Sequence, residues 1–512
     1  MRGFALGLLC LSLAGCSVLP QTTKNQVRGT LPVVKPEKPR ALSELHGHDD
    51  VHRARQIMAE HSSVEYYSDF SLGILEISDD GTINPSQKEQ VFKMLDAETK
   101  PGGLLVVFVH GWHHGARTCD RDLCCFRTVL SKLKQTRTRA YGAEVAGQNV
   151  VGVYIGWRGE SRQSKGLNLT TIWNRKDVAE TLGRGSAKEL LLEINERYWN
   201  SQDQLTMLSI GHSLGGALLF QAAKETLTGN VSDIEQQEVR SYRVARADCD
   251  REQALGGRVK ARRMGFGDLV ILVNPALEAN EYRALDDDLY DRTKDGWTRD
   301  QLTKAALPYD KNVPYPDNQL PILVAIASVD DSAVGTIFPI SRWFLSPVKP
   351  SIAYRKNERI GIGHYAPHVT HHLGYADPMT PEELKARDPR DEDRKNCDCP
   401  MLTAEPRVGG TRLDLQKASQ SFGPGDKFTL SLTPQRQERG WDLNSPYYVI
   451  EAEPKIISEH SDIFNEYFVG FLAQFMDAYY TKYERLEKEH ALDCRYELPS
   501  GTIVGGTAAA KR

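Results

Sequence analysis

The sequence of 512 residues has no strong excess of charge of either sign. It holds 64 Lys and Arg against 68 Asp and Glu, which gives a formal net charge of −4. It therefore lacks the basic surplus that is typical of nucleic-acid-binding proteins, and nucleic acid is not expected as a partner. Apart from one short run at its start, the chain also lacks long apolar stretches of the roughly 20 residues that a membrane-spanning helix needs.

Metal-binding patterns are also scarce. Cys397-Asp398-Cys399 is followed by no third and fourth ligand at a spacing known for zinc sites. The segment "HGHDDVH", residues 46–52, holds three His and two Asp, but it is best interpreted as a solvated polar segment because nothing fixes its geometry. No metal or other cofactor is therefore expected.

The one apolar run at the N-terminus predicts export. "MRGFALGLLCLSLAGC" has a basic start at Arg2 and a short apolar core, as in a secretory signal. Its end, Leu13-Ala14-Gly15-Cys16, resembles the lipobox of bacterial lipoproteins. The resemblance implies that residues 1–15 are removed, that Cys16 carries the lipid (palmitate among its chains), and that the protein lies in the bacterial envelope. Ser17 fits the outer membrane, and the alternative is a plain cleaved signal with an incidental cysteine.

Nine cysteines are present in all. Without Cys10 of the signal and Cys16, seven remain, at positions 119, 124, 125, 249, 397, 399 and 494. An exported protein meets an oxidising compartment, so disulfides are expected, and the odd number leaves one thiol free or paired between chains. The pairing is open.

Buried-strand patterns alternate with helical patterns along most of the chain. We predict strands over 70–81, 103–111, 149–157, 205–210, 268–275, 321–328 and 446–453, and helices over 84–95, 121–135, 176–199, 214–227 and 462–489. Continuous apolar runs suit strands that are covered on both faces. The sequence therefore predicts an α/β protein with a mostly parallel sheet between two layers of helices.

Other segments interrupt this pattern. Residues 16–62 are expected to be a lipidated, flexible tether, residues 63–494 one catalytic domain, and residues 495–512 a disordered tail. Insertions are expected at about 229–263, 279–318 and 340–440. The last precedes the final strand and is interpreted as a lid.

The pentapeptide Gly211-His212-Ser213-Leu214-Gly215 carries the chemistry. An apolar strand precedes it and a small-residue helix follows, so the serine lies at a sharp strand-to-helix turn. Small residues two positions before and after it keep that turn free of collisions, and the turn presents the serine Oγ at the positive end of the helix. Ser213 is therefore the predicted nucleophile.

At this point the chain resembles the α/β-hydrolase superfamily, in particular its serine esterases and lipase-like members. The resemblance implies an oxyanion hole with one donor from the backbone N–H of Leu214. The second donor would come from the loop after an early strand, Val109-His110-Gly111-Trp112, with the N–H of Trp112 as the candidate.

The same resemblance implies an acid after the strand 321–328 and a histidine after the last strand. Asp331 is preferred for the acid, with Asp330 as the alternative. His460 is preferred for the base because a strand, a short loop and a closing helix surround it. The alternative is the cluster His364, His368, His371 and His372, of which His371 is the best member. The order Ser, Asp, His matches α/β hydrolases.

The sequence thus predicts a lipid-anchored serine hydrolase that cleaves small-molecule or lipid carboxylic esters through an acyl-enzyme. Two alternatives stay open: an acyltransferase with the same triad, and a catalytically silent envelope lipoprotein that uses the fold for binding. The acyl chain, the alcohol part, the membrane face, the oligomeric state and the role of the histidine cluster are not fixed.

Overall fold

A computed structural model describes the greater part of the predicted catalytic domain. The described residues are 35–39, 41–42, 62–117, 120–145, 147–159, 172–200, 205–227, 266–283, 285, 320–331, 360–382, 399, 410–415, 417–433 and 445–493. Several predicted features lie outside them: the signal 1–15, Cys16, most of the tether 16–62, the insertion 229–263, most of 279–318, much of 340–440 and the tail 495–512.

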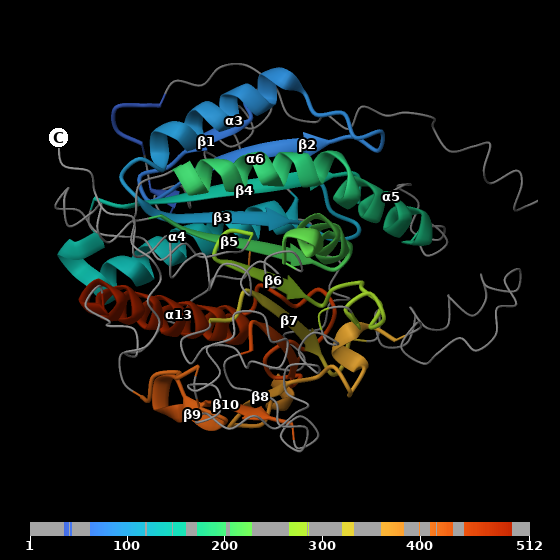
Figure 1. Cartoon of the computed structure of the whole chain (residues 1–512), viewed down its shortest axis with the longest axis vertical. Coiled ribbons are helices and arrows are strands. Elements are labelled where there is room, and N and C mark those ends of the chain that lie inside the picture. The colour runs from blue at the N-terminus through green and yellow to red at the C-terminus, as the bar shows by residue number, and fades with distance from the viewer. Residues whose placement is uncertain are drawn as a thin grey trace, which may run out of the picture.

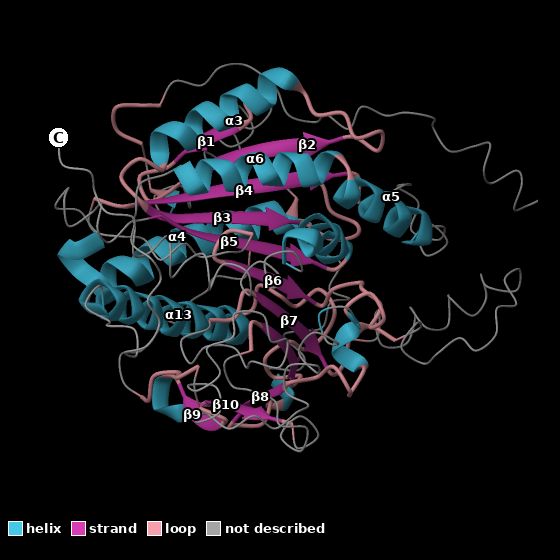
Figure 2. Cartoon of the chain, viewed as in Figure 1, coloured by secondary structure: helices cyan, strands magenta, loops and turns pink. Residues whose placement is uncertain are grey.

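One eleven-stranded mixed sheet forms the centre of the protein (Figure 2). Its order is β1-β2-β4-β3-β5-β6-β7-β11-β8-β10-β9, and the strands from β2 to β8 run parallel. The strands are β1 (Val64–Tyr66), β2 (Ser71–Ile77), β3 (Gly103–Val109), β4 (Asn149–Trp157), β5 (Leu205–His212), β6 (Leu269–Val273), β7 (Leu323–Ser328), β8 (His371–Tyr375), β9 (Ser419–Phe422), β10 (Phe428–Leu432) and β11 (Tyr447–Ala452). The prediction of an α/β protein with a mostly parallel sheet is confirmed.

Helices cover the sheet on both faces (Figure 1). They are α3 (Pro85–Glu98), α4 (Arg121–Tyr141), α5 (Ile172–Arg184), α6 (Ser186–Asn200) and α13 (Glu466–Asp493), a further helix over 214–227, and the short 3-10 helices η2 (Gly142–Val145), η6 (Ile362–His364) and η7 (Pro424–Asp426). Within the described ranges, none of the helices combines the length and the apolar character that crossing a bilayer requires.

Strand alternation divides the core into two layers. Val107 and Val109 of β3 pack with α3, α5, α6 and the helix 214–227, whereas Val106 and Phe108 pack with α4 and α13. This division follows from the strand order. A right-handed crossover places its helix on one face of the sheet when the chain steps to one side, and on the other face when it steps to the other side. The chain steps from β3 to β4 in one direction and from β5 to β6 in the other. The strand order therefore reverses at β3 and β5, where α/β sheets bind their ligands beyond the carboxyl ends of the strands.

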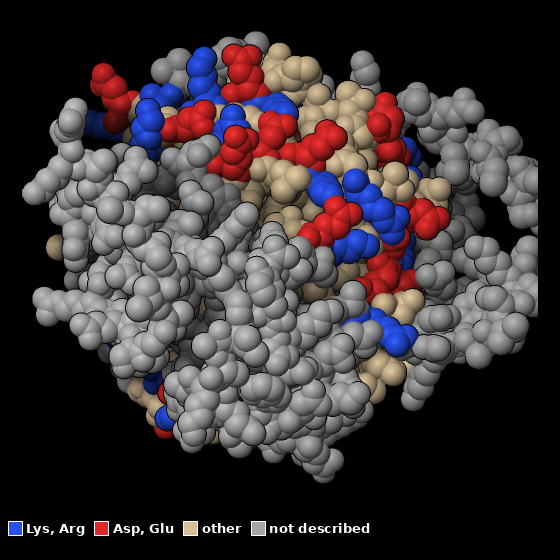
Figure 3. Space-filling model, in the orientation of Figure 1, with Lys and Arg blue, Asp and Glu red and all other residues tan. Residues whose placement is uncertain are grey.

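Charged side chains of both signs lie on the outer surface of α3 and α6. Figure 3 shows Lys and Arg interspersed with Asp and Glu over α3 and α6. Lys88 and Glu193 form one such pair between the two helices at 2.5 Å, and Arg197 and Asp96 form another at 3.1 Å.

Two features differ from the sequence expectations. The single helix predicted over 176–199 is wrong: α5 ends at Arg184 and α6 begins at Ser186, with a turn at Gly185, where a glycine disfavours an uninterrupted helix. The described part of 340–440 also supplies β8, β9 and β10, which extend the sheet beyond β11. No strands were predicted there, because the segments are short and their apolar residues are few.

A disulfide ties the segment between β8 and β9 to α4. Cys125 of α4 is bonded to Cys399, which lies 274 residues further along the chain and packs against the α4 and α13 layer. Cys124 is buried beside it, with its Sγ 3.7 Å from Arg127 Nη1. The bond closes a long loop in the unfolded chain, so it reduces the entropy of the unfolded state.

Cys399→Ala is expected to lower the free energy of unfolding by about 2–5 kcal/mol, because the unfolded chain regains the freedom that the cross-link removes. Denaturant unfolding followed by circular dichroism measures the loss. Cys124→Ala is the matched control and should cost less, since it breaks no cross-link. Equal losses for the two variants would contradict a stabilising role of the disulfide.

Candidate active site

Ser213 lies at a tight turn between β5 and the helix 214–227. Its backbone has φ of +55°, a left-handed conformation that side-chain-bearing residues rarely adopt. Gly215 approaches β3 so closely that a Cβ there would lie 2.2 Å from the His110 carbonyl oxygen, and a Cβ on Gly211 would lie 2.8 Å from the Gly215 carbonyl oxygen. Both glycines are therefore required for this turn, as the spacing of the pentapeptide predicts.

Three side chains from distant parts of the chain form a hydrogen-bonded row. His460 Nδ1 lies 2.8 Å from Asp331 Oδ2, and His460 Nε2 lies 2.6 Å from Ser213 Oγ. The carboxylate only accepts, so Nδ1 carries the proton and donates it, and Nε2 accepts the Ser213 hydroxyl. This is the arrangement in which an imidazole removes a proton from a serine.

The loop after β7 separates the two candidate acids. Asp331 is 1% exposed and contacts His460, whereas the neighbouring Asp330 is exposed. The Asp330 N–H donates to Ser328 Oγ at 3.1 Å, and the Asp331 N–H donates to the Ser328 carbonyl at 3.2 Å. This turn directs Asp331 inwards and leaves Asp330 in solvent.

His460 lies in the loop between β11 and α13, which is fixed at both ends. Asn465 caps α13, and its Oδ1 accepts the N–H groups of Tyr467 and Phe468 at 2.9 and 3.0 Å. Near β11, the Lys455 ammonium group lies 5.3 Å from the Tyr375 ring centre and 5.0 Å from the Tyr467 ring centre, within range of cation–π attraction. The loop is thus held to both β8 and α13.

The candidate oxyanion loop follows β3 and lies directly against the serine. A Cβ on Gly111 would come within 2.8 Å of Ser213 Cβ, so the backbone that leads to Trp112 runs beside Ser213. His113 has φ of +68°, and its N–H donates to the Gly159 carbonyl at 3.3 Å. Leu214 is the first residue of its helix, so its N–H has no acceptor within the helix.

His110 fixes the start of this loop as a neutral side chain. Its Nε2 accepts the Trp157 backbone N–H at 3.0 Å, and its Nδ1 donates to the Gly111 carbonyl at 2.9 Å. The Trp157 indole N–H donates to the His110 carbonyl at 2.9 Å. Burial lowers the pKa of His110, which favours the neutral ring that these bonds require.

Of the alternative histidines, His371 and His372 lie in β8, whereas His364 ends η6 and His368 lies between η6 and β8. His371 opens β8, is 2% exposed, and lies 2.9 Å from Thr370 Oγ1 through Nδ1, with its ring 4.4 Å from that of Tyr448. Burial lowers the pKa of His371 to about 3. His368 Nε2 donates to the Ala279 carbonyl at 2.9 Å. It is His460 that the structure places against Ser213.

A buried acid and base network lies behind the serine turn. His114 Nδ1 lies 3.1 Å from Asp120 Oδ1, and its Nε2 lies 3.3 Å from Asp122 Oδ1. The other oxygen of Asp122 faces His212 Nδ1 at 3.8 Å. Burial opposes the charge on His114, but the carboxylates of Asp122 and Asp120 outweigh it and raise the pKa of His114 to about 9.

His114→Gln should therefore change the pH dependence of stability. The folded state binds this proton more tightly than the unfolded state, whose pKa is near 6.5, so the stabilisation is complete below pH 6.5 and is lost as the pH rises through 9. The difference in free energy of unfolding between wild type and His114→Gln is expected to shrink by about 3 kcal/mol from pH 6 to pH 10. Chemical denaturation at the two pH values measures it, and a constant difference would contradict the charged pair.

Three carboxylates gather beyond β6, but an ammonium group already balances them. Glu180, Glu278 and Glu281 place oxygens within 4.8 Å of one another, and Lys176 Nζ lies 2.8 Å from Glu278 Oε2 and also contacts Glu180. Burial raises the pKa of Glu281 to about 8. Gln221 of the helix 214–227 donates to Glu281. The cluster joins α5, that helix and the loop after β6.

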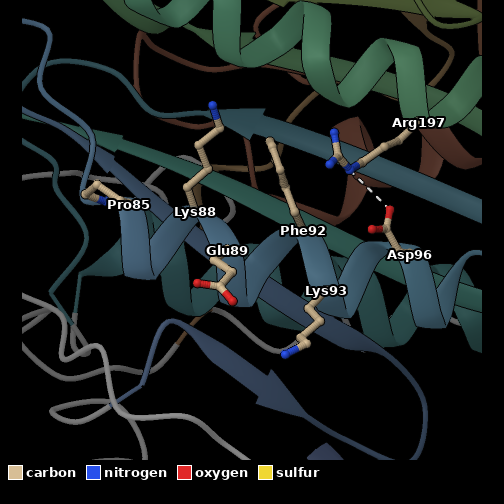
Figure 4. A pocket seen from close by; sticks show the side chains of 7 residues that line it. All are labelled: Pro85, Lys88, Glu89, Phe92, Lys93, Asp96 and Arg197. Carbon is tan, nitrogen blue, oxygen red and sulfur yellow. Dashed lines mark ion pairs between the residues drawn. The ribbon is translucent and has the colours of Figure 1, made fainter.

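A separate hollow lies on the outer surface formed by α3 and α6. Figure 4 shows its lining residues, Pro85, Lys88, Glu89, Phe92, Lys93, Asp96 and Arg197. The Arg197 guanidinium group lies 3.9 Å above the Phe92 ring and pairs with Asp96. None of these residues comes from the carboxyl ends of the strands, so the hollow is distinct from the candidate site.

Two polar residues next to the site were not among those predicted from the sequence. Asn274 and Ser328 stand at the ends of the predicted strands 268–275 and 321–328, and both contact the loop that carries His460. The sequence does mark them, because each is a polar residue at the end of a buried apolar strand, at the edge of the sheet where the catalytic loops are expected.

No family model, no curated protein and no solved structure matches the chain.

Proposed function

We propose that the protein is a serine hydrolase. The observation that carries the proposal is the row Asp331–His460–Ser213, with contacts of 2.8 and 2.6 Å and the serine in a left-handed turn at the start of a helix. The parallel strands support an α/β-hydrolase fold, since serine, acid and histidine follow β5, β7 and β11 in that chain order.

In the proposed mechanism, His460 accepts the Ser213 proton while Oγ attacks the acyl carbonyl. The N–H groups of Leu214 and Trp112 stabilise the negative charge on the carbonyl oxygen. Asp331 keeps Nδ1 protonated and stabilises the imidazolium ion. His460 then protonates the leaving alcohol, and water repeats the sequence to release the acid from the acyl-enzyme.

More particularly, we propose a lipid-anchored carboxylic ester hydrolase of the bacterial envelope. Cys16 of the lipobox-like segment is the proposed anchor. The Cys125–Cys399 disulfide supports an oxidising compartment, because structural disulfides are rare in the cytosol. The insertion 340–440 is proposed to form a lid, except for β8, β9 and β10, which join the sheet.

The activity is tested with p-nitrophenyl esters of increasing acyl length, using residues 17–512 as a soluble protein. Wild type is expected to release p-nitrophenol with a preference for one chain length, and Ser213→Ala to fall to the background rate. Hydrolysis by Ser213→Ala at the wild-type rate would exclude the proposed site. No hydrolysis by wild type, with or without detergent micelles, would argue against an esterase.

The anchor is tested separately in a bacterial host fed an alkyne-tagged fatty acid. The full-length protein is expected to carry the tag and to sediment with membranes, and Cys16→Ser to lose the tag. Equal tagging of the two would contradict lipidation at Cys16.

A further inference from the structure

The backbone of the His460 loop is held by side chains from three adjacent strand ends. His212 Nε2, at the end of β5, lies 3.0 Å from the His460 carbonyl oxygen, and Asn274 Nδ2, just after β6, lies 2.9 Å from the same oxygen. Ser328 Oγ, at the end of β7, donates to the Ile457 carbonyl at 2.6 Å. We refer to His212, Asn274 and Ser328 as the strand-end clamp.

The clamp residues are themselves fixed. Asn274 Oδ1 accepts the Ser328 N–H at 2.9 Å, and the Asn274 N–H donates to the Ile326 carbonyl at 2.8 Å. Asn274 has φ of +43°, a conformation that Asn adopts more readily than most residues. His212 is 2% exposed, and Asn274 and Ser328 are fully buried. A rigid, dry support of this kind holds its partner in one position.

We propose that the strand-end clamp positions His460 against Ser213, a role that rests on the proposed function. The His460 carbonyl accepts two side-chain donors, so the backbone of this residue is fixed, and its imidazole then reaches both Asp331 and Ser213. His212 and Asn274 are positioning residues, because they contact the His460 backbone while His460 itself contacts the reacting serine.

Position matters here because proton transfer depends steeply on geometry. A misplacement of about 1 Å in a catalytic group costs on the order of 10²-fold in rate. His212 lies next to the nucleophile in the chain, so one residue ties the turn that carries the serine to the loop that carries its base. The clamp therefore couples the two halves of the site.

The test compares matched variants at both donors. His212→Gln keeps an N–H donor near Nε2, whereas His212→Phe removes it. Asn274→Gly tolerates the positive φ and loses both the donor and the acceptor. Two readouts are made on the folded protein: hydrogen exchange of residues 453–465 against that of β3, and the rate at which a fluorophosphonate modifies Ser213.

His212→Phe and Asn274→Gly are expected to speed exchange of the loop at least tenfold while β3 stays protected, and to slow labelling of Ser213 by about 10–100-fold. His212→Gln should restore most of both. If the loop of His212→Phe and Asn274→Gly exchanged at the wild-type rate, the clamp proposal would be overturned. It would also be overturned if the loop exchanged faster while Ser213 was still labelled at the wild-type rate. A wild-type protein that does not react with the probe contradicts the proposed function instead, and loop exchange then decides the clamp alone.

Discussion

Replacing His460 by alanine is expected to lower ester hydrolysis by about 10⁶-fold in kcat, close to the loss for Ser213→Ala. His460 Nε2 lies 2.6 Å from Ser213 Oγ and is the group that takes the serine proton in the proposed mechanism. Without it the hydroxyl stays protonated and is a weak nucleophile. Because the two residues act as one unit, the double variant should be no slower than either single variant.

The matched control is His371→Ala, the alternative base. His371 lies in β8 with its ring against Tyr448, so this change removes packing but leaves the row of the candidate site intact. Activity per folded molecule, with folding checked by circular dichroism, is expected to stay near that of wild type. A collapse of activity in folded His371→Ala together with an active His460→Ala would reverse the assignment.

Asp331→Asn is expected to lower kcat by about 10⁴-fold with little loss of fold. An amide in this position can donate to Nδ1, which would move the imidazole proton to Nε2 and leave no lone pair for the serine. The imidazolium ion would also lose its buried counter-charge, since Asp331 is 1% exposed. Steady-state kinetics at pH 8 measure the effect.

Asp330→Asn makes the same chemical change one residue away. Asp330 is exposed, and it is the backbone N–H of Asp330, not its side chain, that donates to Ser328 Oγ. The change to Asn leaves that bond in place, so kcat should stay within about twofold of wild type. If Asp330→Asn carried the large loss and Asp331→Asn did not, the roles of the two aspartates would be exchanged.

The central sheet could be predicted from the sequence because its strands are buried on both faces. The run 103–109 is apolar throughout, the run 205–210 holds four apolar and two polar residues, and a glycine follows each run within two residues. The carboxyl ends of parallel strands meet at one edge, so residues as distant in the chain as Ser213 and His460 are expected there. The register supports this, as β3 pairs Val109 with Gly211 of β5.

The edge strands and the polar supports could not be predicted in the same way. β9 and β10 are short, β9 buries only Phe422, and the buried residues of β10 alternate with less buried ones, so neither strand has a continuous apolar run. The Cys125–Cys399 pairing depends on how the extension folds back on α4, which spacing does not specify. The polar residues Asn274 and Ser328 at the strand ends are visible in the sequence, but the carbonyl groups of the His460 loop that they bind are backbone atoms, which the sequence does not mark.

The proposal that Ser213 is an activated nucleophile is tested most directly by covalent labelling. Residues 17–512 are treated with a fluorophosphonate, and the modified residue is mapped by peptide mass spectrometry. We predict that Ser213 is modified selectively, that His460→Ala abolishes the modification, and that His371→Ala retains it. A folded protein in which Ser213 stays unmodified, both in buffer and with detergent micelles, would contradict the serine hydrolase mechanism.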